Sequence, residues 1–332
     1  MSKSVNYAGK TVEPGEKANG VVYVRDLFAD GQPLELPFMI YNGVEKGPRL
    51  YVQVAQHPAE TWGLEGVYNV LHGLETSDLS GVIVFSLPNP IGFRFASYYP
   101  PHITHDINRV GYGKPDGSLM ERIVYAWWVN FVKDKADYVI DIHGAPPASF
   151  VYYEAHGVSP GVPLDVAEKS ERMALLFSCD FNMKQMEPYG GGTSFRGACV
   201  DYGIPAIVPE IAIGGAKLTE RGLRNIMVNL GMIDGEIELP DKQYTLKYIE
   251  DRFASAIKNR IAGCFISSVK IGDIVSEGDE VGIIYSPRTF DVVETLIAHR
   301  DGYVSSIRDY PVKVAGETVL SIHEVLEVVE NK

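Results

Sequence analysis

The chain has 332 residues, of which 45% are hydrophobic and 22% are charged, and this composition excludes disordered, collagen-like and coiled-coil proteins. The formal net charge of −13 argues against a nucleic-acid partner, because an acidic surface repels phosphate backbones. No apolar run approaches the ~18 residues of a membrane-spanning helix, and the first residues contain no signal-peptide-like stretch. The three cysteines are far apart and indicate no disulfide framework. We therefore expect a cytoplasmic protein without a membrane partner.

Apolar runs of strand length alternate with helical patterns through the first two-thirds of the chain. The strand-like runs are LYVQVAQ (50–56), GVIVFSLP (81–88), DYVIDI (137–142) and IPAIVPEI (204–211). The helical patterns occupy residues 61–74, 119–134, 164–180 and 219–233. This alternation predicts an α/β fold, and near-continuous Val/Ile runs are typical of buried parallel strands. We expect a mixed, mostly parallel sheet flanked by helices in a first domain, residues 1–245.

The sequence changes character after about residue 240, where short β-like segments are broken by Gly and Asp. The pieces VKIGDIVSEGDEVG and VKVAGETV read as related hairpins, so we expect a small β-rich domain of the barrel/sandwich hybrid type over residues 246–332. This segment resembles the lipoyl and biotinyl carrier domains, which present a modifiable lysine at a hairpin tip. The matching stretch, VETLIA (293–298), has no lysine. A module that packs on the first domain or walls its substrate pocket is therefore favoured over a carrier.

Two strand ends carry residues that could bind a metal ion. His57 and Glu60 follow the run 50–56, and Asp141 and His143 lie at the end of the run 137–142. Ligands of open α/β sheets bind beyond the carboxyl ends of the strands, and two histidines with one glutamate form an open, catalytic zinc set. Asp141 shares a strand face with His143 and could orient it. Taken separately, the His57–Glu60 spacing arises often by chance, and His143 could be an ordinary hydrogen-bonded histidine.

Further candidates could bind an anion or act as a base. Asn108 and Arg109 together would form a good carboxylate clamp, although Arg109 alone could equally make a surface ion pair. Glu210 lies in an apolar run, where a carboxylate needs either a partner or a function such as general base beside a zinc-bound water. Arg94 and Arg196 are additional candidate anion contacts.

These motifs occur in a characteristic order along the chain: His57-x-x-Glu60, Asn89-Pro90, Asp106-Ile107-Asn108-Arg109, Asp141-Ile142-His143 and Glu210. In this set the chain resembles the succinylglutamate desuccinylase/aspartoacylase family of zinc-dependent amide hydrolases, which are related to the metallocarboxypeptidases. The resemblance covers most of the chain and implies a zinc carboxypeptidase-like fold for the first domain. It also implies one zinc ion on His57, Glu60 and His143, a substrate carboxylate on Asn108 and Arg109, and Glu210 as the base.

Several positions depart from the pattern of this family. Pro58 stands where a glycine is usual, and Ala59 precedes the glutamate. Arg94 is the only candidate for a second arginine ahead of the Asp-x-Asn-Arg motif, and the sequence VGYG (110–113) follows that motif in place of the common Phe-Pro-Gly. These changes affect substrate recognition more than zinc binding.

The sequence therefore predicts a zinc-dependent hydrolase of linear amides that removes the acyl group from an N-acylated amino acid or small amine. The expected partner is a small-molecule substrate, and the sequence leaves open whether the chain also forms a homo-oligomer. Two other functions stay open: a metallocarboxypeptidase acting on short peptides, and a non-catalytic binding protein on the same fold.

Overall fold

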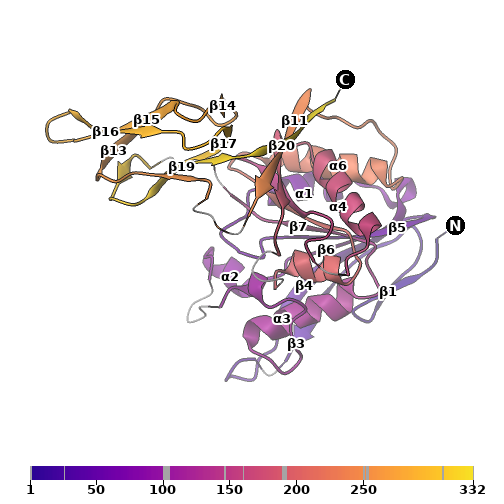
Figure 1. Cartoon of the computed structure of the whole chain (residues 1–332). Helices are drawn as coiled ribbons and strands as arrows, with labels where there is room; N and C mark the ends of the chain where they lie inside the picture. Colours follow the sequence, from indigo (N-terminus) through magenta and orange to yellow (C-terminus); the bar gives the residue numbers. More distant parts are fainter. Residues whose placement is uncertain are drawn as a thin grey trace.

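The computed structural model describes residues 2–25, 27–99, 105–145, 147–159, 161–188, 193–249, 251, 254–308 and 310–331. At its centre is a ten-stranded sheet with the order β20-β11-β9-β8-β10-β7-β5-β6-β4-β3. In Figure 1, β3 lies at one end of this sheet, and β11 and β20 lie at the other. Its strands are β3 (Lys17–Val24), β4 (Leu34–Asn42), β5 (Glu45–Val54), β6 (Ser80–Ser86), β7 (Tyr138–Ile142), β8 (Phe150–Glu154), β9 (Phe181–Gln185), β10 (Ala206–Glu210), β11 (Lys242–Tyr248) and β20 (Val325–Glu330). A small hairpin, β1 (Val5–Tyr7) and β2 (Lys10–Val12), precedes it.

Helices cover both faces of this sheet. They are α1 (Leu64–His72), α2 (Pro90–Phe95), α3 (Leu119–Trp127), α4 (Leu164–Leu176), α5 (Phe195–Asp201) and α6 (Ala216–Asn229). Apolar residues of α3 and α5 share one buried cluster with the sheet, and those of α1 and α6, with most of those of α4, share another. Adjacent residues of β5 alternate between the two, since Tyr51 belongs to the first cluster and Leu50 and Val52 to the second. Within the described ranges, no helix combines the length and the apolarity needed to cross a membrane.

The predicted α/β architecture is confirmed. The strand-like runs form β5, β6, β7 and β10, which lie in or beside the centre of the sheet and pair in parallel. The helical patterns form α1, α3, α4 and α6, and α3 begins with a capping box in which Ser118 and Glu121 each bond the other's backbone N–H. A one-turn π-helix, Trp128–Val132, extends α3. The antiparallel strands β3, at the edge of the sheet, and β4, beside it, were not anticipated.

The C-terminal part forms two four-stranded sheets with the orders β12-β19-β17-β14 and β16-β15-β13-β18. Their strands are β12 (Ala256–Lys258), β13 (Gly263–Ser267), β14 (Ile274–Val275), β15 (Glu280–Tyr285), β16 (Val292–Ile297), β17 (Gly302–Ile307), β18 (Val312–Lys313) and β19 (Thr318–His323). All their pairings are antiparallel, and they enclose a separate apolar core, as expected of a small β-rich unit.

The chain does not end in this small unit. After β19 it returns to the large sheet, where β20 pairs antiparallel with β11 along the outer edge (Figure 1). β11 itself crosses the predicted boundary at residue 245, so both parts share the last two strands of the sheet. The exact division of the chain into domains stays a prediction.

Candidate active site

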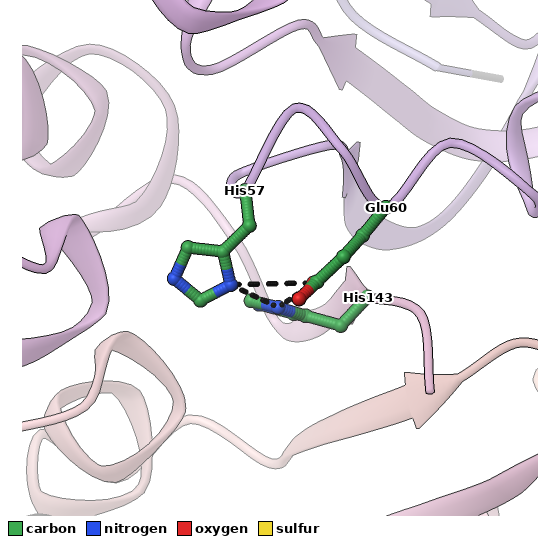
Figure 2. Close-up of side chains that lie close together, drawn as sticks. All are labelled: His57, Glu60 and His143. Atoms are coloured by element: carbon green, nitrogen blue, oxygen red, sulfur yellow. Dashed lines mark hydrogen bonds and ion pairs between the residues drawn. The ribbon is translucent and has the colours of Figure 1, made fainter. Parts of the chain in front are cut away.

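The side chains of His57, Glu60 and His143 meet at the carboxyl ends of β5 and β7, as Figure 2 shows. The Nδ1 atoms of the two histidines are 3.1 Å apart. Oε2 of Glu60 lies 3.2 Å from Nδ1 of His57 and 2.8 Å from Nδ1 of His143. Three potential ligand atoms therefore converge on one point, from residues up to 86 positions apart in the sequence.

The backbone at the end of β5 turns sharply to bring His57 there. Ala55 has a φ of 63°, a left-handed conformation that is uncommon for a residue other than glycine. The loop that follows is held by Asn89, whose side chain donates to the carbonyl of Gln56 (3.0 Å) and accepts from the backbone N–H of Gly92 (3.1 Å). Asn89 thus caps α2 and fixes the ligand loop, which explains the Asn-Pro motif in structural terms.

The end of β7 places His143 directly beside Glu210 of β10. The backbone of His143 donates to the carbonyl of Pro209 (2.8 Å) and accepts from Ile211 (3.0 Å), so the two strands stay paired as far as the site. Gly144 follows, and a Cβ at this position would lie 2.5 Å from the ring of Trp62 and 3.2 Å from Cβ of Glu60. Only glycine therefore allows Glu60 to approach this strand end.

A carboxylate lies close to the far nitrogen of each histidine. Nε2 of His57 lies 2.9 Å from Oδ1 of Asp106, and Nε2 of His143 lies 3.2 Å from Oδ2 of Asp141. Asp141 is fully buried and accepts a 2.7 Å hydrogen bond from the Gln53 side chain, its cross-strand neighbour on β5. The orienting function of Asp106 was missed in the sequence, although the residue opens the Asp-x-Asn-Arg motif.

The pKa values in the cluster indicate that its carboxylates stabilise a positive charge placed between them. Burial alone would raise the pKa of Glu60, but its hydrogen bonds to His143 and His57 outweigh burial and hold the pKa at about 2. Burial would likewise lower the pKa of His143, yet Asp141 and Glu60 keep it well above its ordinary value. The same carboxylates would stabilise a bound cation.

The donor set suits one divalent cation. Zinc binds histidine nitrogen and carboxylate oxygen at about 2.0–2.2 Å, so tetrahedral ligands on one ion are separated by roughly 3.3–3.6 Å. The observed separations of 2.8–3.2 Å are close to this range. Because both Nε2 atoms face carboxylates, both Nδ1 atoms can present lone pairs to an ion.

Most of the other predicted residues line one small cavity of about 60 Å³ next to the cluster: Asn108, Arg109, Arg196 and Glu210. Asn108 is buried, and its Oδ1 accepts from the backbone N–H of Phe195 (2.8 Å), which fixes the orientation of its amide. Arg109 donates to the carbonyl of Asn108 (2.7 Å) and lies 3.7 Å from Asp106. The cavity therefore combines the metal-ligand cluster with groups able to bind a carboxylate.

Arg196 and Arg94 differ in their positions. The Arg196 side chain is only 2% exposed, and it is held by an ion pair with Glu154 (3.4 Å) and a hydrogen bond to Gln185. Arg94 is exposed on α2 and does not belong to the described lining of the cavity. Arg196 thus lies at the site, where the carboxylate of Glu154 balances its charge. Arg94 does not lie at the site.

Glu210 and Tyr98 complete the surroundings of the cluster. Burial raises the pKa of Glu210 to about 7, against the opposing effect of the nearby His143. The ring of Tyr98 stacks on His57 at a centroid distance of 4.0 Å and lines the same cavity. A carboxylate with a pKa near neutrality, beside a cluster able to hold a cation, can accept and return a proton.

Comparisons with known proteins identify related sequences and folds. Residues 46–227 match the succinylglutamate desuccinylase/aspartoacylase catalytic domain. The N-alpha-acetyl-L-2,4-diaminobutyric acid deacetylase of Halomonas elongata is 26% identical over 296 residues, which span 85% of this chain and 84% of that protein.

Two solved structures have similar folds. The product-bound ectoine utilization protein EutE (DoeB) of Ruegeria pomeroyi has a TM-score of 0.77 at 19% identity, covering 93% of this chain and 95% of its own. An aspartoacylase family protein of Mesorhizobium loti has a TM-score of 0.77 at 22% identity, covering 98% and 99%. At these identities the two structures establish the fold. Because the matched catalytic domain spans more than half of the sequence, the chain belongs to the succinylglutamate desuccinylase/aspartoacylase family.

Proposed function

We propose that the protein is a zinc-dependent deacylase that hydrolyses the amide bond of an N-acylated amino acid or small amine. One observation carries this proposal: the ligand atoms of His57, Glu60 and His143 converge in a cavity that also contains Glu210 and Arg109. The name of the Halomonas relative describes removal of an acetyl group from an amino acid, and this supports the same class of reaction.

His57, Glu60 and His143 would hold the zinc ion. Bound there, zinc supplies Lewis-acid polarisation of the acyl carbonyl and of a water molecule. Asp106 and Asp141 keep the two imidazoles in the tautomer and orientation that ligation requires.

Glu210 performs the proton transfers of the proposed reaction. It accepts a proton from the attacking water as the new C–O bond forms at the acyl carbon. It then returns that proton to the amide nitrogen as the C–N bond breaks, so the products are an amine and a carboxylic acid, which loses its proton to water. A pKa of about 7, raised by burial, suits a group that must both take and give a proton near neutral pH.

Asn108 and Arg109 bind the carboxylate of the amino-acid half. Arg109 provides a planar guanidinium, which can donate two parallel hydrogen bonds to one carboxylate. The Oδ1 atom of Asn108 is occupied by the Phe195 backbone, so its NH₂ group remains to donate to the substrate. These contacts would convert binding energy into orientation of the carbonyl at the reaction centre.

We expect about one zinc ion per chain in the wild type, measured by plasma mass spectrometry after dialysis, because three ligands form a preset open site. His57→Ala and His143→Ala should lose this zinc, and Asp106→Asn and Asp141→Asn should weaken binding about 10–100-fold through misoriented ligands. His72→Ala, at an exposed position on α1, is the matched control and should keep full occupancy. Stoichiometric zinc in both ligand variants would refute the assignment.

A panel of N-acyl amino acids and short peptides tests the reaction itself. The zinc-loaded wild type should release free amino acid from N-acyl amino acids faster than it releases C-terminal residues from peptides. Glu210→Gln should retain zinc and lose kcat by roughly 10²–10⁴-fold, the usual effect of removing a general base. Glu168→Gln, a surface carboxylate on α4, should be unaffected. A preference for peptides indicates a carboxypeptidase, and no turnover of any compound indicates a binding protein.

Arg109→Ala should lower kcat/KM for N-acyl amino acids roughly 10–100-fold, the effect of losing a hydrogen bond to a charged group. For the matching N-acyl amino-acid amides, which lack the carboxylate, kcat/KM should change little. Arg109→Lys should recover only part of the loss, because lysine cannot form the planar fork. Arg224→Ala, on the exposed side of α6, is the control. Equal losses of kcat/KM for the acids and the amides would show that Arg109 does not bind the substrate carboxylate.

A further inference from the structure

A second, much larger cavity adjoins the reaction centre. Its volume is about 760 Å³, and Glu60, Tyr152 and Glu210 line both it and the small cavity. The small cavity measures about 60 Å³. The larger one falls within the roughly 300–1,000 Å³ of sites that bind drug-sized ligands. An acetyl group at the reaction centre would leave nearly all of the larger cavity without substrate atoms.

The wall from the large sheet is aromatic. The Phe150 and Tyr152 rings of β8 pack edge to face at 4.9 Å, and Tyr152 packs in the same way on Tyr248 of β11 at 5.0 Å. All three residues line the large cavity. This wall offers apolar contact to a ligand that lies along it.

The opposite wall comes from the C-terminal sheet and carries hydroxyl groups. Ser305 and Ser306 of β17 and Thr318 and Ser321 of β19 line the cavity. The Ser305 hydroxyl is engaged by Nδ1 of His323 at 2.7 Å. Burial, together with the nearby Arg300, lowers the pKa of His323 to about 4, so this histidine is neutral at physiological pH.

Arg308, directly after β17, is the one lysine or arginine on the lining that the described residues provide. Its side chain is exposed and forms no hydrogen bond or ion pair with the described residues. Of the acidic lining residues, Glu60 and Glu210 belong to the reaction centre, and Asp251 already has an interaction of its own. A full positive charge is thus available at the C-terminal wall of the cavity.

The two halves of an amide substrate leave the planar amide group in opposite directions. With the amino-acid carboxylate on Asn108 and Arg109 in the small cavity, the acyl chain points toward the large one. We infer that the large cavity is the acyl subsite and accepts an acyl chain considerably longer than acetyl, lying along the aromatic wall with a terminal carboxylate bound by Arg308. This inference rests on the proposed deacylase function and adds to it the size and charge of the acyl group.

Three substrates that share one amino acid test the subsite: N-acetyl-, N-hexanoyl- and N-adipoyl-L-alanine. Hexanoyl and adipoyl chains have the same length and differ in the terminal carboxylate. For the zinc-loaded full-length protein we expect kcat/KM to rise from acetyl to hexanoyl, and by about 10–100-fold more for adipoyl, the usual effect of a hydrogen bond to a charged group. Arg308→Ala should remove the adipoyl advantage, mainly through KM, and leave the acetyl substrate unchanged.

Two further variants sharpen the comparison. Arg308→Lys keeps the charge and should retain part of the adipoyl advantage. Arg288→Ala removes an exposed arginine on the loop between β15 and β16 of the same sheet unit and should change none of the three rates. An adipoyl-to-hexanoyl ratio that is the same in wild type and Arg308→Ala overturns the function assigned to Arg308. A preference for acetyl over both longer chains overturns the acyl subsite.

Two other results are distinguishable from these. If Arg308→Ala slows only N-acetyl-L-2-aminoadipate, whose extra carboxylate lies on the amine half, the cavity binds the amino-acid side chain and the inference is wrong. If the wild type hydrolyses none of the substrates, the proposed function has failed. The subsite can then still be tested by measuring the binding of adipate and of hexanoate by calorimetry. Arg308→Ala should weaken the binding of adipate and leave that of hexanoate unchanged.

Discussion

The buried contact between Asp141 and His143, supported by Gln53, is the constraint on which the site depends. A carboxyl group without exposure to water is costly unless it is hydrogen-bonded, and Asp141 obtains that bond from its cross-strand neighbour on β5. The parallel register of β5 and β7 therefore sets the position of His143. Because β5 also leads into the loop of His57 and Glu60, one strand pairing positions all three candidate ligands.

Close packing around the cluster explains residues that look unusual in the sequence. Pro58, which replaces the usual glycine, packs where a Cβ on Gly92 would come within 2.5 Å of its ring. The glycine of the neighbouring helix thus accommodates the proline of the ligand loop. Gly144 provides the same freedom beside Trp62 and Glu60. The departures from the family pattern at 58 and 59 are therefore compatible with the convergence of the ligand atoms.

The central strands could be predicted from strong local signals, and the meeting of the three candidate ligands from the order of several motifs that are each weak alone. Val/Ile runs mark β5, β6, β7 and β10, and polar residues that directly follow such runs lie at the edge where a site forms. Partners set by tertiary packing could not be predicted. Asp106 reaches His57 across 49 positions, and the pairing of Arg196 with Glu154 depends on the position that β8 takes in the sheet. The return of β20 to the large sheet is likewise set by tertiary packing, through its pairing with β11.

The C-terminal sheets take part in the structure around the site as well as in their own core. β20 closes the edge of the large sheet, and β17 and β19 contribute one wall of the cavity beside Glu60 and Glu210. The most direct test of the central claim is an anomalous-scattering map at the zinc edge from crystals of the zinc-loaded protein. The account predicts one peak about 2.0–2.2 Å from Nδ1 of His57, Nδ1 of His143 and Oε2 of Glu60. A map with full zinc occupancy elsewhere and no peak at these atoms would contradict it.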